Sequence, residues 1–174
     1  MTGARRGFSM MEVVLSIMLV GVVLVASMNT LAGAKAASAQ LNERSTGAVL
    51  CESMMSEILS QRYADASDGE TSFGKRLAEV GDGSRKLFDD VDDYDGWAST
   101  PPEERDGSPI AWATGLTRSV TVECVRPSDF SGTSPDGACL KLVRVTVKRK
   151  ARVVYELEAY ASPLWPDPRA EESE

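Results

Sequence analysis

The sequence contains no histidine, and this absence excludes several kinds of chemistry. Without imidazole there is no Ser-His or Cys-His nucleophile and no histidine ligand for a metal. Its three cysteines are too few for a four-cysteine zinc site. Cationic side chains are also in the minority, 19 Lys and Arg against 26 Asp and Glu, and a net charge of −7 disfavours contact with a nucleic-acid backbone. We therefore expect no enzymatic activity, no cofactor and no nucleic-acid partner.

Charge is absent from one long segment near the N-terminus. Residues 13–34 are 22 consecutive uncharged residues, rich in Val, Leu, Ile and Met. As a helix, this segment spans about 33 Å at ~1.5 Å per residue, close to the ~30 Å of a hydrocarbon core. Arg5 and Arg6 precede it, and basic residues favour the cytoplasmic side. The pattern predicts a single membrane span, with the residues after Lys35 on the far side.

A secretory signal peptide is the simplest interpretation of this segment. Arg5 and Arg6 would form its basic region, and Ala32-Gly33-Ala34 its cleavage site. The product would be a secreted or membrane-anchored periplasmic binding domain that begins after Ala34, with calcium as a candidate ligand. Two features disfavour this: the apolar run is long, and Glu12 lies at its front. A carboxylate at membrane depth costs roughly 2.5–3.5 kcal/mol.

A second interpretation rests on a family resemblance. Arg6-Gly7-Phe8-Ser9-Met10-Met11-Glu12, followed at once by Val and Leu, resembles the leader of type IV pilins and type II secretion pseudopilins. The resemblance implies that prepilin peptidase cleaves between Gly7 and Phe8, so that residues 1–7 are a leader, and methylates the new amine. It also implies that Glu12 is the assembly glutamate of the family. Met10 stands where leucine is usual, an apolar exchange.

The two predicted charges at the mature N-terminus need partners. Cleavage after Gly7 exposes an ammonium group at Phe8, four residues before the Glu12 carboxylate. In a medium of low dielectric constant, an isolated charge is unfavourable. The resemblance implies that Glu12 of an incoming subunit attracts the Phe8 amine of a subunit already in the filament. The alternative is a pair within one chain.

The helix is predicted to continue beyond the membrane. No proline occurs between residues 1 and 100, and the first loop signals start near Asp65. We expect one helix over residues 8–62, with 8–34 in the membrane and 35–62 packed in the periplasm. Gly21, Gly33 and Gly47 are the weak points of this helix, where it is able to bend or to unwind locally. Apolar residues of the second half form one stripe at helical spacing: Leu41, Ala48, Cys51, Met55 and Ile58.

An acidic segment lies in the irregular region predicted for residues 63–115. Residues 89–95 contain five carboxylates, and calcium takes such clustered oxygen ligands. The candidate calcium ligands are Asp90, Asp92, Asp93 and Asp95. The spacing does not fit an EF-hand, and we favour an acidic turn whose carboxylates bind local backbone, anchored by Phe88, Tyr94 and Trp97. Asp-Asp-Val-Asp-Asp-Tyr followed by Gly also resembles a segment of minor pilins of the mannose-sensitive haemagglutinin branch.

Alternating apolar residues predict an antiparallel sheet over residues 116–162. The strand patterns cover 120–124, 139–148 and 153–161. The last two form a hairpin with a turn at 149–151, Val147 opposite Val153 and Arg144 opposite Glu156. Helix and sheet together predict an α+β fold of the pilin type, one long N-terminal helix packed on a small antiparallel sheet.

The cysteines divide into a predicted pair and a single thiol. Cys124 and Cys139 share the inward parity at the two ends of a Gly-, Pro- and Ser-rich loop, and an exported location permits oxidation. We expect them to form a disulfide, with Cys51 as a buried free thiol; a bridge from Cys51 is the alternative. The tail at 163–174 is proline-rich and acidic, and we expect it to be disordered.

These observations favour a structural role over catalysis. The expected protein is a minor pilin or pseudopilin that crosses the inner membrane once, with its C-terminal domain in the periplasm, and later enters a filament. The resemblance implies four kinds of partner: prepilin peptidase, other pilin or pseudopilin subunits, an assembly platform in the inner membrane, and membrane lipid.

Overall fold

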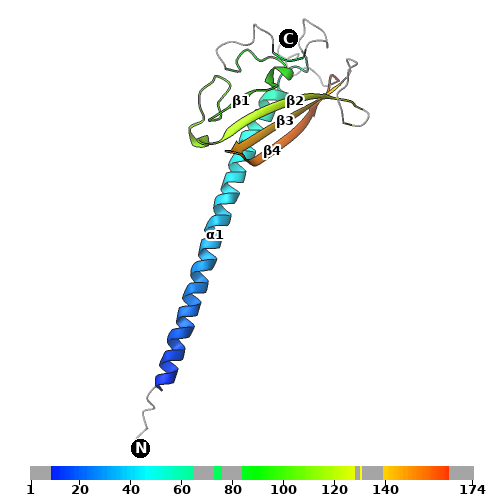
Figure 1. Ribbon diagram of the computed structural model, residues 1–174. Helices are drawn as coiled ribbons and strands as arrows, with labels where there is room; N and C mark the ends of the chain where they lie inside the picture. The colour runs from blue at the N-terminus through cyan, green and yellow to red at the C-terminus, as the bar shows by residue number, and fades with distance from the viewer. Residues whose placement is uncertain (1–8, 65–72, 76–83, 128–129, 131–138, 165–174) are drawn as a thin grey trace, which may run out of the picture. The chain divides into compact units, whose positions relative to one another are not determined.

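The computed structural model describes residues 9–64, 73–75, 84–127, 130 and 139–164 (Figure 1). The chain divides into two compact units, Met1–Asn42 and Glu43–Glu174. Helix α1 (Met10–Leu59) begins in the first unit and ends in the second. The predicted leader, the Gly7–Phe8 junction and the tail from residue 165 onward lie outside the described residues. They stay predictions.

The described chain has an α+β fold. A four-stranded sheet follows α1, with the strand order β1-β2-β3-β4 and antiparallel pairing throughout. Its strands are β1 (Ala98–Ser99), β2 (Thr117–Val125), β3 (Leu140–Arg149) and β4 (Arg152–Ala161). Two short 3₁₀ helices, η2 (Asp92–Tyr94) and η3 (Ala111–Ala113), lie between α1 and β2. The predicted fold class is confirmed, and the short strand β1 is an addition to the three predicted strands.

The first unit is the exposed part of α1. Ser9 precedes the helix; its carbonyl oxygen accepts the Glu12 amide at 2.9 Å, and its hydroxyl oxygen accepts the Met11 amide at 3.3 Å. The large apolar side chains that follow are all open to solvent; the most shielded, Val13, exposes 46% of its surface. This helix is long and apolar enough to cross a membrane.

In the second unit, one face of α1 packs against the sheet (Figure 1). The predicted stripe is correct from Cys51 onward but wrong at its start, because Leu41 is 67% exposed and Ala48 is only partly buried. Buried residues of α1 begin at Gly47, and the buried stripe continues through Leu50. The buried residues of the helix are Gly47, Leu50, Cys51, Met54, Met55 and Ile58.

Gly47 allows strand β4 to approach the helix closely. A Cβ atom at this position would lie 2.8 Å from the Cβ of Tyr155 and 3.0 Å from Cγ1 of Val154. Helix α1 runs through Gly21, Gly33 and Gly47 without interruption. The helix is therefore not unwound at these glycines, and Gly47 serves close packing of β4 on α1.

The predicted hairpin register is wrong. Val147 lies opposite Tyr155 and Arg144 opposite Glu158, whereas Val153 pairs with Lys148. The pairing shifts between Val147 and Lys148, which marks a bulge, and the turn has only two residues between Arg149 and Arg152. One extra residue reverses the faces of the residues beyond it, so Val153 is 49% exposed instead of inward.

Candidate functional sites

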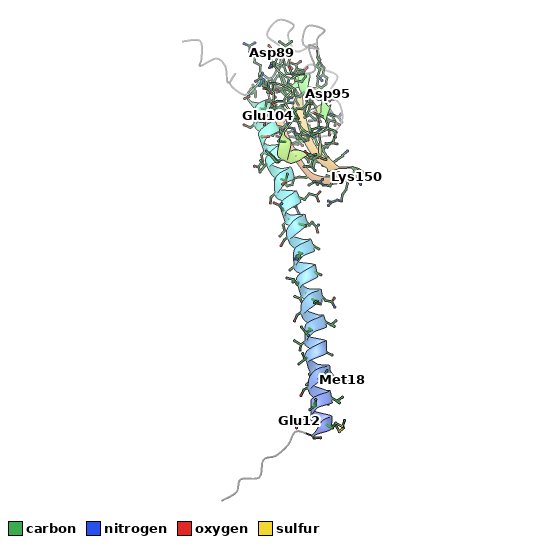
Figure 2. The ribbon with its side chains drawn as sticks, turned by 90° about the vertical axis from the view of Figure 1, so that its left-hand side faces the viewer. Glu12, Met18, Asp89, Asp95, Glu104 and Lys150 are labelled. Carbon is green, nitrogen blue, oxygen red and sulfur yellow. A yellow bond between two sulfur atoms is a disulfide. The ribbon has the colours of Figure 1, made fainter. Side chains whose placement is uncertain are left out.

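Glu12, the predicted assembly residue, lies in the first turn of α1 and is exposed (Figure 2). Among the described residues, its carboxylate forms no hydrogen bond or ion pair. The two residues of the predicted cleavage junction, Gly7 and Phe8, lie outside the described part of the chain.

The polar side chains of the apolar helix are satisfied locally. The hydroxyl groups of Ser16, Ser27 and Thr30 each donate to the carbonyl oxygen four residues earlier, at 2.8, 2.8 and 3.0 Å. Such internal bonds are what a lipid environment requires, because hydrocarbon offers no partner. A shallow, open groove on this surface is lined by Met18, Gly21, Val22, Val25, Ala26 and Asn29.

The acidic segment is a hydrogen-bonded turn. Asp90 Oδ1 accepts the amides of Asp92 and Asp93, at 2.9 and 3.1 Å. Asp93 Oδ2 accepts the amides of Asp89 and Asp90, at 2.9 and 3.3 Å. Asp95 Oδ1 accepts the Val122 amide on β2 at 2.9 Å. The carboxylates thus bind backbone, as the favoured interpretation of this segment predicts.

Three aromatic residues hold this turn in the core. Phe88, Tyr94 and Trp97 are at most 6% exposed, and the rings of Phe88 and Tyr94 meet edge to face at 5.0 Å. The anchoring predicted for these three residues is confirmed.

The candidate calcium ligands fall into separate environments. Asp90 and Asp93 have carboxylate oxygens within 4.8 Å of one another and of Asp89, close enough to share a cation. Asp92 forms an ion pair with Lys141, and Asp95 binds β2. Burial, together with the nearby Asp92 and Asp93 carboxylates, raises the pKa of Asp90 to about 7. Calcium binding stays the less favoured interpretation of this segment.

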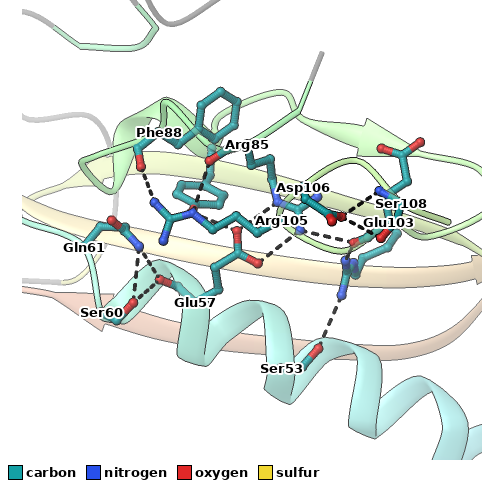
Figure 3. Close-up of polar contacts among 12 residues, drawn as sticks. Ser53, Glu57, Ser60, Gln61, Arg85, Phe88, Glu103, Arg105, Asp106 and Ser108 are labelled. Atoms are coloured by element: carbon teal, nitrogen blue, oxygen red, sulfur yellow. Dashed lines mark hydrogen bonds and ion pairs between the residues drawn. The ribbon is translucent and has the colours of Figure 1, made fainter. Parts of the chain in front are cut away.

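A buried polar network joins the end of α1 to the segment before β2 (Figure 3). The Arg85 guanidinium, 1% exposed, donates to both Glu57 carboxylate oxygens at 3.0 Å. The Tyr94 hydroxyl donates to Glu57 Oε1, also at 3.0 Å. The Trp97 ring lies 4.2 Å from the Arg85 guanidinium carbon. The network fixes the acidic turn against the helix.

Arg118 extends this network from β2. It is 2% exposed and donates to the Leu50 carbonyl oxygen at 3.2 Å and to the Glu103 carbonyl oxygen. Burial, and then the charge of Arg85, lower the pKa of Arg118 to about 10, so it remains charged at neutral pH. Sequence reasoning missed both arginines, although Arg118 shares the inward parity of Val120 and Val122.

The cysteine predictions are confirmed. Cys124 and Cys139 form a disulfide with their Cα atoms 5.5 Å apart. Cys51 is a free, buried thiol that donates to the Val145 carbonyl oxygen at 3.5 Å. Burial raises the pKa of Cys51 to about 12, which suppresses the reactive thiolate. Cys51 therefore serves as core.

Comparison with protein-family models, curated proteins and solved structures found no match to the chain.

Proposed function

We propose that the chain is a non-catalytic minor pilin or pseudopilin, processed by prepilin peptidase and assembled into a type IV pilus or a type II secretion pseudopilus. The order of residues at the N-terminus carries the proposal: Gly7, Phe8 and Glu12 stand directly before the uncharged segment. That segment belongs to one helix long and apolar enough to cross a membrane. The second unit adds an α+β domain with a buried, structural polar network, which fits an assembly subunit.

The proposed location is the inner membrane, with the second unit in the periplasm. Arg5 and Arg6 favour a cytoplasmic N-terminus. The Cys124–Cys139 disulfide supports this orientation, because disulfides persist in oxidising compartments. In the membrane, the exposed apolar side chains of the first unit contact lipid.

In the proposed filament, those side chains contact the helices of neighbouring subunits. Gly21 and Ala26 line the shallow groove of the first unit, and small residues let two helices approach closely. The Glu12 carboxylate pairs with the methylated amine of Phe8 on a neighbouring subunit. The pair gives each incoming subunit a fixed register, since two isolated charges in lipid would be unfavourable.

The mass and N-terminal sequence of the mature protein test this proposal. A mature chain that starts at Phe8 and carries one extra methyl group is the expected result. A start at Lys35 would replace the proposal with the secreted or anchored periplasmic domain. A chain that keeps its first seven residues in a host with active prepilin peptidase would also contradict it.

Replacement of Glu12 tests the assembly step separately. We expect the Glu12→Val variant to insert into the membrane normally. The amount of it that is recovered with sheared filaments should fall to less than half of the wild-type amount. Glu52→Val is the matched control, since Glu52 is an exposed glutamate of the same helix in the second unit. Equal recovery of the Glu12 variant and the control would remove the proposed role of Glu12.

A further inference from the structure

Lys141 is a buried lysine on β3. It is 4% exposed and occupies the inward parity of Val143 and Val145. Its ammonium group contacts Asp92 Oδ1 and the Tyr63 carbonyl oxygen, and lies 4.4 Å from the centre of the Tyr63 ring. A lysine is almost never fully buried without a partner, so the Asp92 contact is what holds its charge in the core.

Asp92 is bound on both carboxylate oxygens. It is 2% exposed; Oδ1 faces Lys141, and Oδ2 accepts the Gly74 amide at 2.8 Å. A backbone N–H in this position stabilises negative charge that develops on Oδ2. The carboxyl carbon of Asp92 thus has an amine on one side and an oxyanion donor on the other.

Asp90 is a buried carboxyl group beside this pair. It is 6% exposed, and its side chain is hydrogen-bonded to Asp92. Asp90 Oδ1 accepts the Asp92 amide at 2.9 Å, which holds the Asp90 carboxyl group next to Asp92. A carboxyl group in this position is within reach to pass a proton to the reacting atoms.

We propose that Lys141 and Asp92 react to form an intramolecular isopeptide bond, with Asp90 as the proton-transfer residue. The product is an amide between Lys141 Nζ and Asp92 Cγ, and one water molecule leaves. The bond would join β3 covalently to η2. This inference does not depend on the proposed function, because it concerns only contacts within the second unit.

The steps balance without any added reagent. The Lys141 ammonium first transfers a proton to the Asp92 carboxylate, which gives a neutral amine and a carboxylic acid. Nζ attacks Cγ, and the negative charge forms on Oδ2, where the Gly74 amide donates. Asp90 gives its proton to the hydroxyl group at Oδ1, which leaves as water. The excess proton on Nζ then returns to Asp90.

The environment favours the bond in two ways. Groups held in contact have effective molarities on the order of 10⁵–10⁸ M, which offsets the unfavourable condensation in water. The buried site also favours the neutral amide, since a buried ion pair bears a desolvation cost. The Arg85–Glu57 pair provides an internal contrast: its cation is as buried as Lys141, but a guanidinium stays protonated and is a poor nucleophile.

Peptide mapping of the full-length protein tests the bond. After reduction and digestion with trypsin, we expect a branched peptide in which residues 87–105 are joined to residues 119–144, with the mass of one water missing. Because the linked Lys141 resists trypsin, the second peptide extends to Arg144. Recovery of residues 87–105 and 119–141 as complete linear peptides would overturn the proposal and leave an ion pair only.

Variants distinguish the roles of the three residues. Lys141→Arg should abolish the branched peptide, and its intact mass should exceed that of the wild type by the Lys-to-Arg difference plus one water. Lys148→Arg, at a less buried lysine of the same strand, should keep the link.

Asp90→Asn tests the proton-transfer residue. It should lower the linked fraction at least tenfold; an unchanged fraction would remove Asp90 from the reaction. Because the wild-type peptide map decides by itself, misfolding of a variant leaves the test intact.

Discussion

The two units of the chain place polar groups by opposite rules. In the first unit, side-chain hydroxyls bond to their own helix, as Ser16 and Ser27 do, and the apolar side chains stay exposed. In the second unit, polar groups bond across segments: Arg85, 28 residues beyond Glu57, pairs with it in the interior. The first pattern suits a helix surrounded by lipid or other helices, and the second a domain that supports its own fold.

The same contrast divides α1 itself. Residues 13–34 have no charge, whereas the last turns of the helix combine buried apolar residues with Glu52 and Glu57. Substitutions in the first unit should therefore leave the free energy of unfolding of the second unit unchanged. Substitutions on the packed face should lower it.

Loss of the Glu57 carboxylate should have the largest effect. Glu57→Ala leaves Arg85, 1% exposed, as an uncompensated buried charge and deprives the Tyr94 hydroxyl of its acceptor. We expect the free energy of unfolding to fall by about 3–5 kcal/mol, measured by urea titration of the detergent-solubilised chain with aromatic fluorescence. Glu52→Ala, at an exposed position, should change it by no more than about 0.5 kcal/mol. A loss below about 1 kcal/mol for Glu57→Ala would show that the network is dispensable.

A matched pair of leucines compares the two units directly. Leu50 is 1% exposed and Leu19 is 60% exposed, and both belong to α1. Leu50→Ala should destabilise the second unit by about 2–5 kcal/mol, because it removes buried methyl groups and leaves a cavity. Leu19→Ala should leave the same urea midpoint unchanged. A common shift in both variants would mean that the units unfold together.

The second unit should become less stable as pH rises, because Asp90 then loses its proton. Its folded-state pKa, about 7, lies above the ordinary value of 3.8, so the folded state binds more protons between these two values. The associated stability is complete below pH 4 and declines by up to a few kcal/mol toward pH 7. Burial, the largest cause, remains whether or not Lys141 and Asp92 are linked.

Urea midpoints measured from pH 4 to pH 8 check this slope. Asp90→Asn should reduce the dependence of the urea midpoint on pH. Asp95→Asn, at an exposed residue, should leave that dependence unchanged. A wild-type midpoint that rises steadily over this range would contradict the expected direction.

The elements that the sequence predicted well are those with a regular pattern. The uncharged run and the spacing of Cys51, Met55 and Ile58 predict α1, and strand parity predicts the Cys124–Cys139 disulfide. In each case the side-chain period is set by local backbone geometry, so no knowledge of distant contacts is needed.

The errors have the opposite origin. The bulge at Val147 and Lys148 depends on how two strands meet, and alternation of residue types alone does not reveal an added residue. Arg85, Arg118 and Lys141 were missed because charged residues are usually exposed, and only the folded chain provides their buried partners. Of the predicted processing and assembly site, Glu12 alone lies in the described chain.

A pair of glycines sharpens the comparison at smaller energies. Gly47→Ala forces a Cβ to within 2.8 Å of the Tyr155 Cβ, so we expect a loss of about 1–3 kcal/mol in the urea titration. At Gly21 nothing lies within 4 Å of an added Cβ. Gly21→Ala should therefore leave the second unit unchanged and favour its own helix by up to about 1 kcal/mol. Equal midpoints for the two variants would mean that β4 yields easily to the added methyl group.

The smallest effect is expected at the sheet surface, where an ion pair resembles that of Arg85 and Glu57 but is solvated. Arg144 donates to Glu158 at 2.6 Å, and their side chains are 35% and 44% exposed. Water screens such a pair, so a double-mutant cycle of Arg144→Ala and Glu158→Ala should give a coupling of about 0.2–1 kcal/mol. The same cycle at Arg85 and Glu57 should give several times more. Equal couplings would mean that burial of the Arg85–Glu57 pair adds nothing to its strength, and the contrast between solvated and buried charges would then fail inside the second unit.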